Sequence, residues 1–114
     1  MTSNATQAVT DALLRARQQG AQADALPLAD ALRDAADAYA VQTAVMSQLR
    51  ADAGLPRYWK SGGPSRELPL THAPLPPAGV WSSPADARAW PFHFRGIEAE
   101  IALAEAIEPS TKYF

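Results

Sequence analysis

The chain has 114 residues, no cysteine, and 10 basic against 12 acidic side chains, a length that suits one domain. Its hydrophobic content of 47% argues against intrinsic disorder, and its net charge of −2 gives no basic surface for nucleic acid. Its apolar stretches fall short of the roughly 20 residues that cross a bilayer, so we expect a soluble, cytoplasmic protein without a membrane partner.

The alanine-rich first half of the chain predicts two helices. From Asn4 to Gln19, apolar residues recur at three- and four-residue spacing, and Gly20 is suited to the position after the helix. A second helix is predicted from about Asp34, or from Asp30, to Asp52, with Gly54 ending it. Its apolar stripe comprises Ala35, Ala36, Tyr39, Thr43, Met46 and Leu49. We therefore expect an N-terminal helical region over residues 1–54.

The second half is rich in proline and predicts strands and loops. The segment Leu55–Arg66 reads as a short strand broken by a glycine-proline turn, with Lys60 where the strand gives way to the turn. The four prolines within Pro69–Trp81 forbid a long helix and favour an extended path. Ser83 and Pro84 resemble an N-cap and first helical residue, which predicts one or two helical turns before Pro91.

The segment Arg95–Leu103 alternates polar and apolar residues. On a strand, Glu98 and Glu100 share one face, and this like-charged pair would be relieved by a bound cation, for which carboxylates suit Mg²⁺ or Mn²⁺. Residue propensities alone favour a helix here, and on a helix the two side chains would diverge by about 200°. The alternative without chemistry is a solvated face for the glutamates and a surface lysine at Lys60. His72 and His93 have no ligand-type neighbour at metal-binding spacing.

Three blocks of the sequence, in this order and at about this spacing, together resemble a known family. They are Asp37–Gln42, Trp59–Gly63 and Arg95–Leu103. The combination is similar to the N-terminal half of 2-keto-4-pentenoate hydratases, within the fumarylacetoacetate hydrolase superfamily. The resemblance covers most of the chain up to Leu103.

The resemblance implies a fold, a site and a reaction. The fold is α+β: two N-terminal helices, then the first strands of a mixed β-sheet domain over residues 55–114, with the C-terminal half of the family fold missing. Glu98 and Glu100 would bind Mg²⁺ or Mn²⁺, and Lys60 would hold the substrate in the active site. The reaction would be the addition of water to a 2-hydroxy-2,4-dienoate, giving a 4-hydroxy-2-keto acid in aromatic catabolism. The complete protein is expected to be a homo-oligomer.

Two departures from the family pattern keep other functions open. Pro77 lies at or beside the place of an Asp that related hydratases have in this loop, and proline cannot transfer a proton. This favours, as alternatives on the same scaffold, a decarboxylase of oxalocrotonate-like acids or a C–C hydrolase of acylpyruvates. The second half of the family fold, with the third carboxylate ligand, has no counterpart here, so we also expect impaired catalysis in a truncated chain. The alternative of another class is a non-catalytic fragment that pairs with another subunit.

Overall fold

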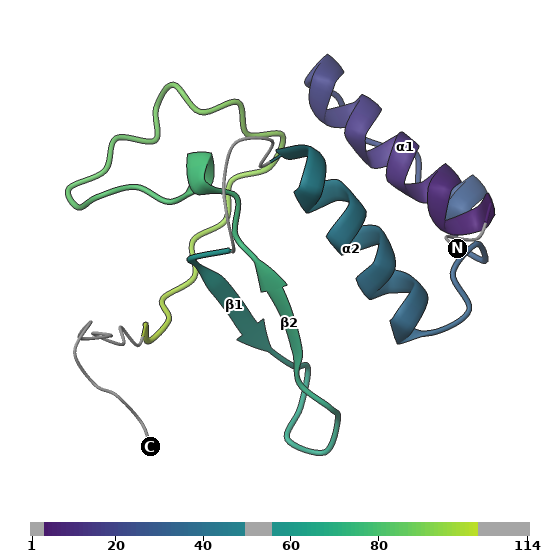
Figure 1. Cartoon of the computed structure of the whole chain (residues 1–114). Helices are drawn as coiled ribbons and strands as arrows, with labels where there is room; N and C mark the ends of the chain where they lie inside the picture. Colours follow the sequence, from purple (N-terminus) through teal and green to yellow (C-terminus); the bar gives the residue numbers. More distant parts are fainter. Residues whose placement is uncertain (1–3, 50–55, 103–114) are drawn as a thin grey trace, which may run out of the picture.

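Two helices are followed by a two-stranded antiparallel sheet, an α+β arrangement as predicted (Figure 1). The computed structural model describes residues 4–49 and 56–102. Helix α1 spans Asn4–Gln19 and helix α2 spans Ala35–Leu49, with a short 3₁₀ turn at Leu26–Leu28 between them. Strands β1 (Trp59–Gly62) and β2 (Thr71–Pro74) follow. The predicted end of the second helix near Asp52 and Gly54 lies outside the described residues.

Helix α1 ends where the sequence predicts. Gly20 has a positive φ of 59°, its amide donates to the Arg17 carbonyl, and the amide of Ala21 donates to the Ala16 carbonyl. These two bonds satisfy carbonyl groups that the end of a helix leaves without an intrahelical partner. The left-handed backbone strongly favours glycine at this position, so a local sequence signal fixes the boundary.

Helix α2 begins with an aspartate cap. The Asp34 carboxylate accepts a hydrogen bond of 2.9 Å from the amide of Asp37, as an N-cap residue does. The Asp37 carboxylate turns back to Arg33 and accepts from its backbone amide at 3.1 Å and from its guanidinium at 2.8 and 3.0 Å. The hydrogen bonds from Arg33 lower the pKa of Asp37 to about 2. The start at Ala35 agrees with the later of the two predicted positions.

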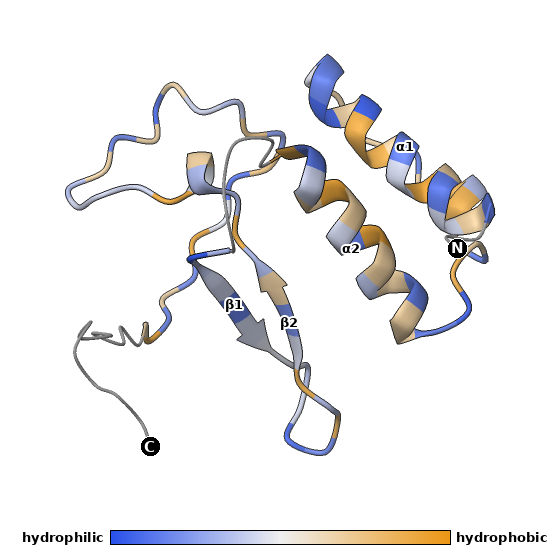
Figure 2. Ribbon diagram, in the orientation of Figure 1, coloured by the Kyte–Doolittle hydropathy of each residue, from blue (hydrophilic) through white to orange (hydrophobic). Residues whose placement is uncertain are grey.

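The core lies between α1 and α2. Its buried apolar residues are Val9, Val41, Val45 and Met46, with partly buried leucines of both helices and of the connection around them. The predicted apolar stripe of the second helix is only partly correct, because Val41 and Val45 face α1 while Tyr39 faces the hairpin. Apolar residues lie on more than one side of α2 (Figure 2), so periodicity alone could not choose the buried side.

The β-hairpin brings Lys60 opposite Ala73. The register pairs Trp59 with Pro74, Lys60 with Ala73, Ser61 with His72 and Gly62 with Thr71. The side-chain hydroxyl of Thr71 also donates to the Gly62 carbonyl at 3.2 Å. The proline-rich segment is therefore extended at β2, as predicted, and Lys60 lies within β1 rather than at its end.

The prediction of a short helix after Ser83 is wrong, because the chain has no helix between Ser83 and Pro91. In its place, the Asp86 carboxylate accepts from the backbone amide of Arg88 at 3.0 Å and from its guanidinium, which makes a tight turn. A side chain that bonds its own backbone two residues on competes with helix formation. The peptide bond between Ser83 and Pro84 is cis. On either side of this loop, the Trp81 and Trp90 rings pack edge to face with centroids 5.1 Å apart.

None of the helices in residues 4–49 and 56–102 has both the length and the apolar character needed to cross a membrane.

Candidate functional site

Lys60 and the two glutamates meet in space. The Lys60 Nζ atom lies 2.9 Å from Glu98 Oε2 and 2.9 Å from Glu100 Oε1. Lys60 comes from β1, and the glutamates come from the extended segment 96–102, which runs beside the hairpin in Figure 1. The three residues that the sequence singled out thus form one cluster, hereafter the Lys60–Glu98–Glu100 cluster.

The segment that carries the glutamates is not helical. Residues 96–102 have neither helix nor sheet pairing within the described part of the chain, although the family resemblance implied a strand there. The side chains of Glu98 and Glu100 nevertheless point to the same cation, as alternation in an extended chain requires. The helical alternative, in which the carboxylates diverge, is therefore wrong.

The charges of the cluster compensate one another. Hydrogen bonds from Lys60 to Glu100 and Glu98 raise the pKa of the lysine, so its ammonium stays protonated. The same ammonium lowers the pKa of Glu98. All three side chains are about half exposed or more, at 48% for Lys60, 54% for Glu100 and 73% for Glu98. Water screens such pairs, so the cluster contributes little to stability, and all three groups are accessible to a ligand.

The donor set fits a hard divalent cation. Two carboxylate oxygens converge on one positively charged atom, the Lys60 ammonium, so the fold brings two oxygen donors to one point. Mg²⁺ and Mn²⁺ prefer carboxylate oxygen and keep several waters when the protein offers one or two carboxylates. In residues 4–49 and 56–102, no group of three His, Cys, Asp or Glu side chains gathers as a metal site. Glu98 and Glu100 are candidate ligands only because the resemblance names them and because their oxygens converge on one point.

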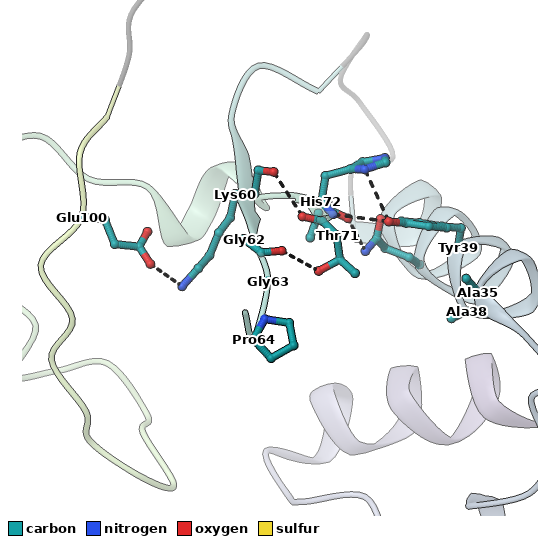
Figure 3. Close-up of a pocket in the computed structure, with 13 residues that line it drawn as sticks. Ala35, Ala38, Tyr39, Lys60, Gly62, Gly63, Pro64, Thr71, His72 and Glu100 are labelled. Atoms are coloured by element: carbon teal, nitrogen blue, oxygen red, sulfur yellow. Dashed lines mark hydrogen bonds and ion pairs between the residues drawn. The ribbon is translucent and has the colours of Figure 1, made fainter. Parts of the chain in front are cut away.

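A pocket of about 630 Å³ lies between α2 and the hairpin and reaches the cluster. Ala38, Tyr39 and Gln42 of α2 line one side, and Lys60 and Thr71 of the hairpin line the other, with Glu100 at its rim. In Figure 3 the Lys60 side chain points toward Glu100 and away from Tyr39. The pocket is wide enough for a small organic acid beside the lysine.

Two residues of α2 hold the hairpin in place and were not singled out as site residues from sequence. The Gln42 side-chain amide donates to the His72 carbonyl at 3.2 Å, and the Tyr39 hydroxyl accepts from the His72 amide at 3.4 Å (Figure 3). Helix α2 thus pairs with the free edge of β2. In the sequence, Tyr39 stands in the predicted apolar stripe of the second helix, and Gln42 ends the block Asp37–Gln42 of the family resemblance. What identifies them is their contact with a residue 33 or 30 positions away.

His72 belongs to the other face of the hairpin. Paired residues of an antiparallel sheet point to the same side, so His72 shares a face with Ser61, whereas Lys60 shares the opposite face with Ala73. The His72 ring stacks on Tyr39 with centroids 4.8 Å apart and lies 5.8 Å from the Trp59 ring. Its side chain therefore packs among aromatic rings, on the opposite face from the Lys60 side chain.

Comparisons with known proteins add no family assignment. No family model matches the chain, and neither a curated protein nor a solved structure matches it significantly. The three sequence blocks and the geometry of the cluster and pocket are therefore the observations that bear on function.

Proposed function

We propose that this chain carries the lysine and two metal ligands of a hydro-lyase that adds water to 2-hydroxy-2,4-dienoates. The observation that carries the proposal is the Lys60–Glu98–Glu100 cluster, in which residues 38 positions apart in sequence meet at 2.9 Å. These are the residues to which the resemblance to 2-keto-4-pentenoate hydratases assigns the substrate lysine and the metal ligands.

The residue types suit the chemistry of an enolizable 2-oxo acid. A divalent cation held by Glu98 and Glu100 would supply a Lewis acid that stabilises negative charge on the enolate oxygen and carboxylate. Lys60 would place a second positive charge at the same anion, and the Ala38 methyl and Tyr39 ring would bound the space for the carbon chain. The pocket would thereby hold the charged end of the substrate at the cluster and its apolar end against α2.

A decarboxylase of oxalocrotonate-like acids, or a C–C hydrolase of acylpyruvates, is the second candidate. The observation in its favour is Pro77, which begins the 3₁₀ turn Pro77–Gly79 in the loop where related hydratases have an Asp. Proline offers no group that can transfer a proton to carbon. All three reactions need an enolate that is stabilised by a metal and a lysine. Pro77 does not affect this shared step, but it removes the proton-transferring residue that hydration needs.

A non-catalytic role in subunit pairing is the candidate from a different class. Ile97 and Ile101 are 99% and 94% exposed, on the side of the extended segment away from the glutamates. Apolar side chains in such a row favour contact with another chain. In this case the cluster would only hold the segment 96–102 against the hairpin.

Metal titration separates the enzyme proposals from the pairing proposal. Calorimetry with Mn²⁺ should show binding to the parent chain and at least about tenfold weaker binding to a Glu98→Gln, Glu100→Gln variant, because charge count sets the affinity of such sites. Asp86→Asn is the matched control, since Asp86 also forms an exposed ion pair, with Arg88, outside the cluster. Equal binding by the parent and the double variant would contradict the metal role.

Product analysis separates the reactions. A 2-hydroxydienoate consumed in the presence of Mg²⁺ or Mn²⁺, with a 4-hydroxy-2-keto acid as the product, supports the hydratase. Release of carbon dioxide from an oxalocrotonate-like acid, or cleavage of an acylpyruvate, supports the second candidate. Sedimentation velocity of the parent and an Ile97→Asp, Ile101→Asp variant tests pairing, which predicts an oligomer that the variant dissociates.

A further inference from the structure

The Lys60 ammonium and a divalent cation compete for the same oxygens. Lys60 Nζ is 2.9 Å from one oxygen of Glu98 and 2.9 Å from one oxygen of Glu100. A Mg²⁺ or Mn²⁺ ion bound to those oxygens at about 2.1 Å would lie at most about 5 Å from the ammonium in its present position. Two positive charges at this distance repel each other. Each carboxylate oxygen also interacts more strongly with a divalent ion than with a singly charged ammonium.

The pocket beside Lys60 offers a second position for its ammonium. Lys60 lines the pocket together with Thr71 and Gln42, while in Figure 3 its side chain is turned toward Glu100 at the rim. Four rotatable bonds and an exposed fraction of 48% let the ammonium move without disturbing β1. In the pocket it would meet the anionic group of a bound organic acid.

We propose that Lys60 gives up the two carboxylates when a divalent cation binds and is thereby freed to hold the carboxylate of the substrate. This inference rests on the metal role proposed above and adds the order of events at that site. Lys60 keeps the glutamates compensated before the metal arrives and turns to the substrate afterwards. Metal binding and anion binding are then coupled through the Lys60 side chain. The metal occupies the two glutamates, which otherwise compete with the substrate carboxylate for the Lys60 ammonium.

The test is the affinity of Mn²⁺ alone for three chains, measured by calorimetry. Lys60→Met should bind Mn²⁺ about tenfold or more tightly than the parent, because the competing ammonium is gone. Arg95→Met is the matched control: it removes a positive charge three positions from Glu98, and the Arg95 guanidinium lies over the Phe92 ring instead of pairing with the cluster. The control should change the affinity by less than about twofold, because an exposed charge that does not pair with the cluster is screened by water and salt.

The outcomes separate this inference from the proposed function. Equal or weaker Mn²⁺ binding by Lys60→Met, with the parent still binding, overturns the exchange and leaves the metal role standing. An affinity gain of the same size in Arg95→Met also overturns it, since general charge would then explain the effect. Absence of Mn²⁺ binding in all three chains overturns the exchange together with the metal role.

A second measurement needs no substitution at Lys60. The sequence has only two lysines, Lys60 and Lys112, so a Lys112→Arg chain has a single lysine for acylation followed by peptide mass spectrometry. Lys60 engaged with two carboxylates should react slowly, and Mn²⁺ should raise its labelling rate several-fold by releasing it. A labelling rate that Mn²⁺ leaves unchanged or lowers contradicts the release of Lys60. This test does not depend on whether the Lys60→Met variant folds.

Discussion

The Lys60 ammonium donates a 2.9 Å hydrogen bond to Glu98, although the two residues are 38 positions apart in sequence. Because Glu100 accepts from the same nitrogen, the segment 96–102 is tied to β1 by side chains instead of by backbone pairing. The chemical groups of the site are thus brought together by charge, on surfaces that water reaches. The framework that carries Lys60 is held separately, by α2 at the edge of β2.

The contact between α2 and β2 can be tested through one amide. In a Tyr39→Phe variant, the His72 amide loses the hydroxyl that accepts its proton, so its hydrogen exchange should accelerate several-fold. Tyr58→Phe is the control, because in the described residues the Tyr58 hydroxyl forms no hydrogen bond with the chain. Nuclear magnetic resonance measures the exchange rate of the His72 amide in both variants. Equal exchange at His72 in the two variants would show that Tyr39 does not hold the hairpin.

The helix pair should be sensitive to the loss of one valine. Val41 is 4% exposed between α1 and α2, so Val41→Ala removes two buried methyl groups and should lower the free energy of unfolding by about 2 kcal/mol. Thr43→Ala on the exposed side of the same helix should change it by less than about 0.5 kcal/mol. Urea unfolding followed by circular dichroism measures the free energy of unfolding of both variants. Similar unfolding midpoints for Val41→Ala and Thr43→Ala would show that Val41 is not part of the core.

Gly20 should tolerate alanine poorly in spite of open space around it. An added Cβ at Gly20 meets nothing within 4 Å, yet the residue has φ +59°, where an L side chain costs about 1 kcal/mol. Gly20→Ala should therefore reduce the free energy of unfolding by about that amount. Gly79→Ala is the control, since Gly79 has the same open space and no positive φ. A larger loss at Gly79 than at Gly20 would contradict the backbone explanation.

Acid should weaken the start of α2. Hydrogen bonds from Arg33 hold the pKa of Asp37 at about 2 in the folded chain, below the ordinary value of 3.8. The folded state therefore binds this proton less readily than the unfolded state, and the stabilisation is present above about pH 4 and is lost as the pH falls toward 2. The carboxyl carbon shift of Asp37 should titrate near pH 2, and Arg33→Met should move that midpoint upward. A midpoint near 4 in the parent would exclude the interaction with Arg33.

Local signals made much of the first half predictable. Apolar spacing and Gly20 gave α1 its range of Asn4–Gln19, and Asp34 marked the start of α2, because helix ends depend on caps and on φ values that nearby residues determine. The same kind of signal failed after Ser83. There the Asp86 side chain bonds Arg88, and the turn competes with the expected helix.

The sequence by itself determined the helices, the extended character of β2 and the identity of Lys60, Glu98 and Glu100 as candidates. Only the tertiary structure decided that Val41 faces α1 while Tyr39 faces the hairpin, since α2 has apolar residues on more than one side. It alone decided that Lys60 lies between the two carboxylates, and that the His72 side chain lies on the opposite face of the hairpin. The physical reason is distance along the chain: propensity and periodicity act over a few residues, whereas ion pairs and strand register join residues that the sequence keeps far apart.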